Sequence, residues 1–599
     1  MQGYKSPQKD ALFVMNELLG FKKHYADLGF EDASPDMVEA IFSEAAKFCE
    51  NVLAPINAIG DEVGAKWEDG VVTTPPGFKE AYQQYVEGGW PGMTHPHEFG
   101  GQELPYSLAS TLGEWLSGAN HSWAMYPGLS QGCMATLKTH GTEEQQKMFL
   151  HKLVEGSWTG TMCLTESHCG SDLGMLKCKA EPNPDGSYNL TGTKIFISAG
   201  EHDFSENIVH IVIARLPDAP SGTRGISLFV VPKFNVSPEG EKLDRNAVTC
   251  GSIEHKMGIK ASATCVINFD GAKGYLVGTE NRGLNCMFTF MNTARIGTGL
   301  EGLSATEAAF QGALKYAKDR LQFRAMKGVQ NPEGPADPII NHPDVRRMLL
   351  TQKALAEGNR ALVIYAMQLV DVTLYSKDDD AKQLAETKLA LLTPIVKAFL
   401  TETAQEATSY GMQVYGGHGY IKEWGMEQLA RDTRICTMYE GTTGIQAIDL
   451  LARKVVGSDG ELLNVFVKEI RDYCVSVRDK SQFAAWSNAI DTHLDEWQQL
   501  TRDVSKRAAT NPEELGAASV DYLMYSGYVV VGYFWLRMAV SAQQKLDEGT
   551  SDVDFYQAKL HTTKFYFDRL LSRTRSLASA MGSGADNLMS MTEEQFLVG

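Results

Sequence analysis

The segment QVYGGHGY, Gln413–Tyr420, lies between a long helical pattern and a further helical segment. Its glycines permit a tight turn that leaves backbone N–H groups exposed, and such a turn suits a diphosphate. A plain turn between two helices is the alternative, because glycine turns are common. The segment alone leaves both interpretations open.

A second segment, RICTMYEGTTGIQ at Arg434–Gln446, places a carboxylate just before a helix. Thr442 or Thr443 can cap the helix that continues as IQAIDLLARKV, so Glu440 precedes its N-terminus. The positive end of the helix favours the ionised carboxylate, whereas an apolar ligand above it would favour the protonated form. Glu440 is therefore a candidate acid–base group, with an exposed glutamate near a helix cap as the alternative.

Around these segments, the hydrophobic pattern predicts long helices at 284–322, 343–374, 381–415 and 443–456. Their lengths and short connections indicate an antiparallel bundle, interrupted by a Gly/Pro-rich loop at 328–343. The motif GTGLEG at 297–302 lies inside the first of these helices. A dinucleotide fingerprint needs a preceding strand, so we interpret these glycines as small residues on a packed helix.

Short β-branched and aromatic runs before the bundle predict an antiparallel β-domain rather than βαβ units. These runs are 188–198, 208–215, 225–231 and 263–269. The flanking parts of the chain read as helices. We therefore predict a mainly α fold with a central antiparallel β-domain, divided into four domains: 1–160, 161–281, 282–456 and 457–599.

Composition narrows the class of function. The chain has 599 residues, and its 55 Lys and Arg against 74 Asp and Glu leave a net charge of −19. Such a surface repels nucleic-acid phosphates, so nucleic-acid binding is disfavoured, although an anionic metabolite needs only a small local patch. The 43% hydrophobic content excludes a chain that is mainly disordered.

Targeting and redox signals favour a cytoplasmic protein. The N-terminus lacks a basic region followed by an apolar run, so no signal peptide is expected. The uncharged window Tyr522–Leu536 is too short to cross a bilayer comfortably, which predicts a buried or interfacial helix. We expect no transmembrane segment and leave peripheral membrane contact open.

The cysteines do not suggest a metal centre. The chain has ten Cys and no CxxC pair. The spacing of the most clustered candidates matches no standard zinc site, so we expect reduced thiols and no metal. These candidates are Cys163, His168, Cys169 and Cys178.

Together with CLTESHCGSD at 163–172, these motifs resemble the acyl-CoA dehydrogenase family of flavoproteins. The resemblance covers roughly residues 40–456, in the family's order of helical domain, β-domain and helical bundle. The length and the C-terminal extension are similar to a branch that includes long-chain acyl-CoA and 3-methylmercaptopropionyl-CoA dehydrogenases. The resemblance implies FAD-dependent α,β-dehydrogenation of an acyl-CoA thioester to the trans-2-enoyl-CoA.

The resemblance also assigns roles to residues. Glu440 matches the base that removes the α-proton, and the alternative position for that base is Ala294, so Glu440 has no rival. The implied FAD contacts, some of them to FAD in a partner subunit, are Thr165, Phe196, Ser198, Arg320, Gln322, Gln413, Gly416, Gly417, Thr442 and Thr443. The implied contacts with the CoA thioester are Ser171, Asn292, Arg295 and Gly441.

Some positions depart from the family's pattern and weaken individual CoA and adenosine contacts. These positions are Cys169, Asn292, Phe323, Arg324 and Gln428. None of them removes the base or the glycine turn. The segment 115–134 resembles the region that shapes the acyl pocket in the family. Aromatic and Met residues at such spacing are more often core than pocket lining, and they do not select a chain length.

The resemblance further implies partners: an acyl-CoA substrate, electron-transferring flavoprotein as acceptor, and a second copy of the chain in a homodimer with FAD at the interface. An acyl-CoA oxidase that passes electrons to O₂ is the nearest alternative. A DNA-binding member of the fold would need a basic face, whereas the extension mixes acidic residues with its Lys and Arg. A purely structural helical scaffold would not need the flavin and base motifs together.

Overall fold

The computed structural model describes residues 3–597, so the outermost two residues of the predicted first and last domains lie outside the described residues. The chain forms two compact units. Unit 1 comprises Phe42–Gly297 and the short segment that ends at Ser6, and unit 2 comprises Pro7–Ile41 and the chain from Thr298 onward. Two helices, α3 (Pro35–Phe48) and α8 (Gly283–Asp319), begin in one unit and end in the other.

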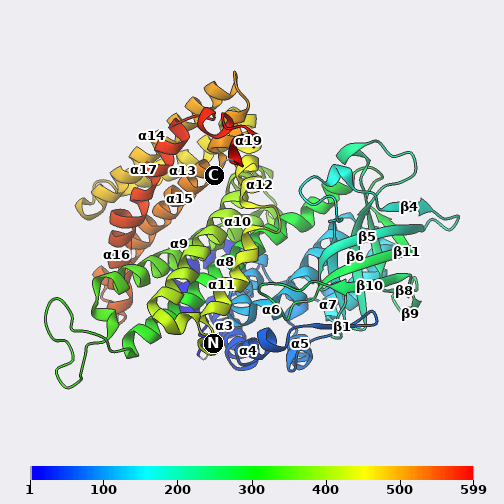
Figure 1. Ribbon diagram of the computed structural model, residues 1–599, viewed down its shortest axis with the longest axis horizontal. Helices are drawn as coiled ribbons and strands as arrows, with labels where there is room; N and C mark the ends of the chain where they lie inside the picture. Colours follow the sequence, from blue (N-terminus) through cyan, green and yellow to red (C-terminus); the bar gives the residue numbers. More distant parts are fainter. Residues whose placement is uncertain (1–2, 598–599) are drawn as a thin grey trace. The chain divides into compact units, whose positions relative to one another are not determined.

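Unit 1 contains a seven-stranded sheet in the order β3-β6-β7-β11-β5-β4, with β10 paired to β11 (Figure 1). The strands are β3 (Trp158–Cys163), β4 (Lys179–Pro182), β5 (Tyr188–Ser198), β6 (Asn207–Ala214), β7 (Ser227–Pro232), β10 (Val248–Ile253) and β11 (Thr264–Val277). The four predicted strands correspond to β5, β6, β7 and β11. The mainly α fold with a central β-domain is therefore confirmed.

The sheet differs from the expectation in one pairing. β3 and β6 run parallel, from Trp158 beside Asn207 to Cys163 beside Val212, while the other pairs are antiparallel. A parallel pair needs a long crossover connection, and β4 and β5 lie within that connection. The sheet is therefore mixed rather than purely antiparallel.

β11 joins the two halves of this sheet. Its residues from Thr264 to Gly274 pair with β5, and Tyr275–Val277 pair with β7. The register against β5 shifts at two places along the strand, as β-bulges do, and bulges let a long strand bend. This pairing holds the end of β5, where Ser198 lies opposite Thr264.

Besides this sheet, unit 1 contains the hairpins β1–β2 and β8–β9 and the α-helices α4 to α7. Their bounds are β1 (Lys66–Glu68), β2 (Val71–Thr73), β8 (Phe234–Val236), β9 (Lys242–Arg245), α4 (Ala54–Val63), α5 (Phe78–Glu87), α6 (Tyr106–His140) and α7 (Glu143–Glu155). α6 is kinked at Asn120, whose side chain accepts a hydrogen bond from Trp123 N at 3.1 Å. The aromatic and Met residues of 115–134 are buried: Trp115, Trp123, Met125, Tyr126 and Met134.

Unit 2 is built on long helices. The bundle helices are α8, α9 (Pro343–Tyr375), α10 (Asp379–Tyr415), α11 (Met426–Arg434) and α12 (Thr443–Ile448). The predicted ranges 343–374 and 381–415 correspond closely to α9 and α10. α12 is shorter than predicted because the helix widens into a π-helical turn at Asp449–Val455.

Two of the three glycines of GTGLEG permit close packing of two bundle helices, whereas a Cβ on Gly297 would meet nothing within 4 Å. A Cβ on Gly299 of α8 would lie 2.7 Å from Val396, and one on Gly302 would lie 2.8 Å from Leu400 O. Both partners belong to α10. The interpretation as small residues on a packed helix is therefore confirmed for Gly299 and Gly302.

The rest of unit 2 is the N-terminal segment with the C-terminal helices. The bounds are α1 (Gln8–Leu12), α2 (Phe21–Asp27), α13 (Glu461–Val477), α14 (Ser481–Ala508), α15 (Glu513–Glu548), α16 (Val553–Phe565), α17 (Thr574–Gly582), α18 (Asp586–Met589) and α19 (Glu593–Phe596). Among the described residues, α15 is the one helix long and apolar enough to cross a membrane. Most of it is buried inside the protein, which is typical of a core helix.

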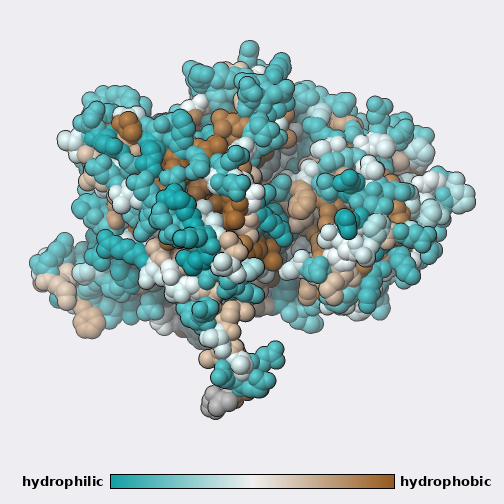
Figure 2. Space-filling model, turned by 90° about the horizontal axis from the view of Figure 1, so that it is seen from above, coloured by the Kyte–Doolittle hydropathy of each residue, from teal (hydrophilic) through white to brown (hydrophobic). Residues whose placement is uncertain are grey.

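One face of the protein is mainly hydrophilic (Figure 2), and the cysteines lie in the interior. Figure 2 shows a face covered mainly by hydrophilic side chains, with hydrophobic ones in scattered patches. All ten cysteines are buried and none forms a disulfide.

Candidate active site

Glu440 lies in a tight loop of unit 2, after the short 3₁₀ turn Ile435–Thr437 and before α12. Two consecutive residues of this loop have left-handed backbone conformations, Glu440 at φ 55° and Gly441 at φ 85°. Glycine adopts this region freely, but a glutamate there is strained by about 1–3 kcal/mol. A strained residue of this kind persists only where its surroundings hold it.

Three side chains hold the loop. Gln446 Nε2 donates to Glu440 O at 2.9 Å, and Lys397 Nζ donates to Gly441 O at 2.7 Å. Thr442 caps α12 by accepting from Ile445 N at 3.3 Å, which decides between the two predicted cap residues. The loop is thus fixed by contacts with two consecutive carbonyl oxygens and by a helix cap.

Thr443, the other predicted FAD contact in this loop, is bound from within unit 2. Its hydroxyl donates to Glu402 Oε1 at 2.5 Å, and Glu402 belongs to α10. Thr442 is exposed, while Thr443 and Glu440 are half-buried. The exposed face of the loop therefore includes Thr442, and Thr443 ties the loop to α10.

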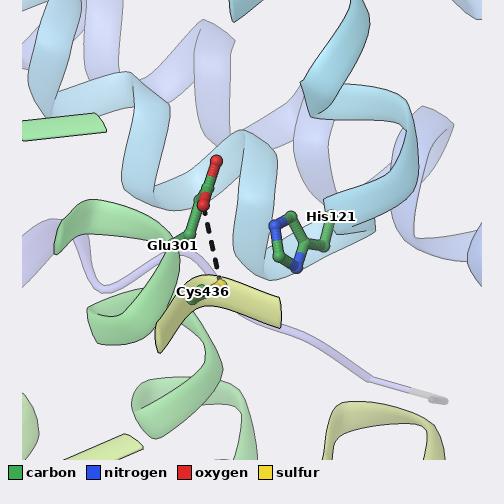
Figure 3. A group of neighbouring side chains, drawn as sticks. All are labelled: His121, Glu301 and Cys436. Carbon is green, nitrogen blue, oxygen red and sulfur yellow. Dashed lines mark hydrogen bonds between the residues drawn. The ribbon is translucent and has the colours of Figure 1, made fainter. Parts of the chain in front are cut away.

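A buried polar cluster lies beside the loop. Cys436 Sγ donates to Glu301 Oε2 at 3.6 Å, which Figure 3 marks with a dashed line, and Tyr439 Oη donates to the same oxygen. Burial and the Glu301 charge raise the pKa of the Cys436 thiol well above its usual range, and burial raises that of the Tyr439 hydroxyl. Both groups therefore stay protonated and donate to Glu301.

The predicted diphosphate turn follows α10 directly. Gly416 has φ 60° and ψ −138°, and a 3₁₀ turn runs through Gly416–Tyr420. Gly416 and Gly417 are exposed, and a Cβ on either would meet nothing within 4 Å. Gln413 is exposed one turn earlier. The structure therefore leaves open space beside the two glycines that the sequence singled out.

Aromatic rings hold this turn against the end of α8. Tyr316 of α8 stacks on Tyr415 with ring centroids 4.2 Å apart, and Tyr316 Oη hydrogen-bonds His418 Nδ1 at 2.9 Å. His418 in turn stacks on Trp424 at 4.4 Å. The ends of α8 and α10 are thereby brought together, and with them Arg320 and the glycine turn.

Arg320 and Gln322 lie in the exposed segment that follows α8. Arg320 O accepts from Ile339 N at 2.8 Å, and Gln322 N donates to Asp337 O at 3.0 Å. Asp337 is fully buried, and burial alone would raise its pKa. Its carboxylate accepts backbone N–H groups from Ala325, Gln330 and Asn331, which lower the pKa to about 2. This charge organises the segment that follows α8, in which Arg320 and Gln322 precede the predicted loop 328–343, although the predicted helix 284–322 had included both residues.

In unit 1, the predicted flavin contacts come together at the end of β5. Ile195 N donates to Thr165 O at 2.9 Å, which joins the loop of Thr165 to the strand that carries Phe196 and Ser198. Phe196 is 57% exposed and has φ 60°, so a large apolar ring is held outward by a strained backbone.

A buried ion pair supports this part of unit 1. Lys194 Nζ donates to Leu164 O and to Glu166 Oε1, both at 2.9 Å. Burial opposes ionisation of Glu166, but the Lys194 charge and the N–H groups of Lys177 and Cys178 keep its pKa below the usual value. His168 and Cys169 lie near Glu166, yet its carboxylate is already bound by these donors, which accounts for the cluster without a metal.

The predicted CoA contacts lie on separate parts of the chain. Ser171 and Asn292 are exposed, the first in the loop after β3 and the second on α8. Arg295, also on α8, is half-buried, and its Nε has no hydrogen-bond partner among the described residues. Gly441 belongs to the Glu440 loop described above.

The residues that hold the Glu440 loop were not identified from the sequence. Lys397 interrupts the apolar run LALLTPIVKAFL, so a lone charge in a buried helix was a usable signal. Gln446 is the last residue of the segment RICTMYEGTTGIQ, but no role was predicted for it. Glu301, Glu402 and Tyr439 gave no comparable signal, because their contacts depend on how α8 and α10 pack.

Comparisons with known proteins cover nearly the whole chain. Residues 35–157 match "Acyl-CoA dehydrogenase, N-terminal domain", and residues 161–272 match "Acyl-CoA dehydrogenase, middle domain". Residues 281–455 match "Acyl-CoA dehydrogenase, C-terminal domain", and residues 466–592 match "Acetyl-CoA dehydrogenase C-terminal like".

Similar proteins agree with these matches. The chain is 40% identical to 3-methylmercaptopropionyl-CoA dehydrogenase of Ruegeria pomeroyi, over 98% of this chain and 99% of that protein. It is 33% identical to the broad-specificity linear acyl-CoA dehydrogenase FadE5 of Mycobacterium tuberculosis, over the full length of both. An acyl-CoA dehydrogenase from Bacillus anthracis, solved in complex with FAD, has the same fold at a TM-score of 0.74 and 19% identity, covering 92% of this chain and 89% of that one. The chain belongs to the acyl-CoA dehydrogenase family of enzymes.

Proposed function

We propose that this protein dehydrogenates an acyl-CoA thioester at the Cα–Cβ bond with FAD as cofactor and Glu440 as the base. The α-proton passes to the Glu440 carboxylate. Bound FAD supplies the acceptor for the β-hydride, chemistry that no protein side chain provides. The product is the trans-2-enoyl thioester.

The observation that carries this proposal is the strained and clamped conformation of Glu440. Strain of this kind clusters at sites where the structure holds a reactive group in place. An exposed capping glutamate needs neither φ 55° nor a side chain bound to its own carbonyl oxygen. A base held in place avoids the loss of rate that misplacement causes.

The residues present fit FAD. Open space beside Gly416 and Gly417 suits a diphosphate, and exposed Arg320 supplies a positive charge from the neighbouring helix end. In unit 1, the exposed Phe196 ring offers a surface for a flat heterocycle. We assign the remaining FAD contacts to Thr165, Ser198, Gln322, Gln413, Thr442 and Thr443.

For the substrate, we propose a fatty acyl-CoA or 3-methylmercaptopropionyl-CoA. The relative with 40% identity is named for the latter and the relative with 33% identity for linear acyl-CoAs. Arg295, with its unpartnered buried Nε, supports a CoA contact on α8, to which we add Ser171, Asn292 and Gly441. A panel of saturated acyl-CoAs that includes the methylthio-propionyl thioester separates the two classes.

We further propose a cytoplasmic homodimer with four domains at the predicted boundaries, FAD at the subunit interface and electron-transferring flavoprotein as acceptor. A monomer that retains FAD in sedimentation would refute the shared cofactor site.

Oxygen consumption without a dye acceptor would indicate an oxidase instead. Basic groups of the extension are paired, as Arg471 is with Asp491 at 2.6 Å and Asp495 at 2.8 Å, which gives no support to DNA binding.

The Glu440→Gln variant tests the base. It should keep the absorbance of bound FAD, because the amide has the size of the carboxylate. Bleaching of the flavin by substrate should slow by roughly 10²–10⁴-fold, the usual contribution of an acid–base group. The exposed Glu423→Gln in the 3₁₀ turn Lys422–Trp424 is the control. Bleaching of Glu440→Gln at the wild-type rate would exclude Glu440 as the base.

A further inference from the structure

Lys397 is a lysine with no exposed surface, in the middle of α10. Its ammonium donates to Gly441 O at 2.7 Å, one residue after Glu440. Burying an ammonium group costs several kcal/mol unless hydrogen bonds and opposite charges compensate. A neutral donor could hold a carbonyl oxygen at lower cost, so the charge itself needs an explanation.

The groups around Lys397 supply that explanation. The carboxylates of Glu440 on the loop, Glu301 on α8 and Glu402 on α10 attract the ammonium electrostatically. Burial lowers the pKa of Lys397, and these groups oppose the shift, which leaves the pKa at about 8. Lys397 is therefore mainly charged at neutral pH.

We propose that Lys397 is a positioning residue for the dehydrogenation, which holds the Glu440–Gly441 backbone in its left-handed conformation and keeps the Glu440 carboxylate ionised. This inference rests on the proposed role of Glu440. Gln446 fixes the carbonyl of Glu440 and Lys397 fixes the next one, so both peptide planes that follow the base are set. The attraction between the ammonium and the carboxylate is mutual, so the charge also disfavours protonation of the base.

Three variants separate the two parts of this role. Lys397→Met removes the donor and the charge, Lys397→Gln retains a donor without the charge, and Lys397→Arg retains both. Lys388→Met is the matched control, because Lys388 is a lysine of α10 whose ammonium binds Glu469 at 2.5 Å, outside the Glu440 loop. The readouts are FAD absorbance, the rate of flavin bleaching at saturating substrate, KM, and the pH profile of bleaching.

Lys397→Met should retain FAD and bleach roughly 10²-fold more slowly, as expected for a misplaced reacting group, with KM changed far less than kcat. The acid limb of its pH profile should move upward by about 1 pH unit, because loss of a nearby cation favours the protonated carboxylate. Lys397→Gln should show the same shift with a smaller loss of rate, and Lys397→Arg should restore the limb. The shift is the readout that a purely structural lysine would not produce.

The outcomes distinguish this inference from the proposed function. If Glu440→Gln loses bleaching but Lys397→Met and Lys397→Gln keep the wild-type rate and acid limb, Lys397 has no positioning role and the base stands. If Glu440→Gln bleaches normally, the proposed function fails first. If Lys397→Met does not fold, the acid limb of Lys397→Gln decides, and an unshifted limb overturns the inference.

Discussion

The two units bury polar groups in different ways. The sheet of unit 1 encloses two histidines, with His202 Nε2 bound to Thr159 Oγ1 at 2.9 Å and His210 Nδ1 bound to Thr161 Oγ1 at 2.7 Å. Burial, followed by the Lys233 charge, lowers the pKa of each to about 3. Unit 1 therefore holds these side chains neutral, among hydroxyl groups.

Unit 1 also buries an ion pair, Lys194–Glu166, but unit 2 buries a network in which each cation binds two carboxylates. Arg360 of α9 binds Asp10 of α1 and, at 2.8 Å, Glu307 of α8, while Lys559 of α16 binds the same Asp10. Lys559 also binds Glu357 at 2.9 Å. Burial would raise the pKa of Asp10, but Lys559 and Arg360 outweigh it and lower the pKa to about 2. The network ties the N-terminal segment and the C-terminal helices to the bundle.

This difference implies that the units fail under different conditions. A buried charge network resists mild acid but depends on each of its members, because the loss of one leaves another charge unpaired. Neutral buried histidines tolerate the loss of a neighbour better, but they oppose protonation. We therefore expect mutation of a network residue to destabilise mainly unit 2, and mild acid to destabilise mainly unit 1.

The largest expected effect comes from Arg360→Met. This change leaves Asp10 with one cation and Glu307 without the guanidinium, and breaking a buried pair in this way costs about 3–5 kcal/mol. Urea unfolding and hydrogen exchange on α9 measure the loss. The control is Lys23→Met, whose side chain is 81% exposed in its pair with Asp27 and should change stability by at most about 1 kcal/mol. Equal effects of the two changes would show that the network does not stabilise unit 2.

Mild acid should act next most strongly, and on unit 1. Both histidines have folded pKa values below the unfolded value of about 6.5, so the unfolded chain takes up protons first as the pH falls. Their contribution is fully present above pH 6.5 and is lost toward pH 3. The slope is about 1.4 kcal/mol per pH unit for each histidine, or about 3 kcal/mol for both at pH 5.5.

Hydrogen exchange on β6 at pH 7.5 and pH 5.5 checks this loss, with α9 as the internal reference. His210 Nε2 has no partner among the described residues, so a proton added there is costly. His210→Gln should remove about half of the acid sensitivity. The exposed His151→Gln should leave it unchanged. An acid response of equal size in β6 and α9 would contradict the difference between the units.

The contrast also shows what sequence can predict. Helix ranges such as 343–374 and the strand 188–198 were predictable, because apolar periodicity and turn residues reflect local burial. The parallel pairing of β3 with β6 was not, since nothing in either strand states its partner. The ion pair between Asp10 and Lys559 was equally unpredictable from the sequence. Each residue looks like an ordinary surface charge until the fold brings the two together.

The candidate site divides in the same way. Glu440, Gly416 and Gly417 were visible because turn-forming glycines and a helix-capping threonine mark an open turn and a loop before a helix. Lys397 and Gln446, which hold the Glu440 loop, depend on contacts made by packing α10 against that loop. Motifs therefore predict candidate reactive groups, whereas the positioning of those groups emerges only from the packed structure.

The smallest of the expected effects tests whether the C-terminal helices stabilise unit 2 through packing as well as charge. A Cβ on Gly527 of α15 would lie 2.1 Å from the ring of Phe399 on α10, and overpacking of this kind costs about 1–3 kcal/mol. Gly527→Ala should therefore destabilise unit 2 in urea and reduce exchange protection on both helices.

Gly516→Ala on the same helix is the matched control, since a Cβ there meets nothing within 4 Å and the residue is exposed. It should stabilise the protein by about 0.5–1 kcal/mol, because alanine is the better helix former. Opposite signs for the two changes would separate packing from helix propensity. A stabilising Gly527→Ala would instead mean that α15 can move away from α10 without cost, and the charge network would then be the main link between the C-terminal helices and the bundle.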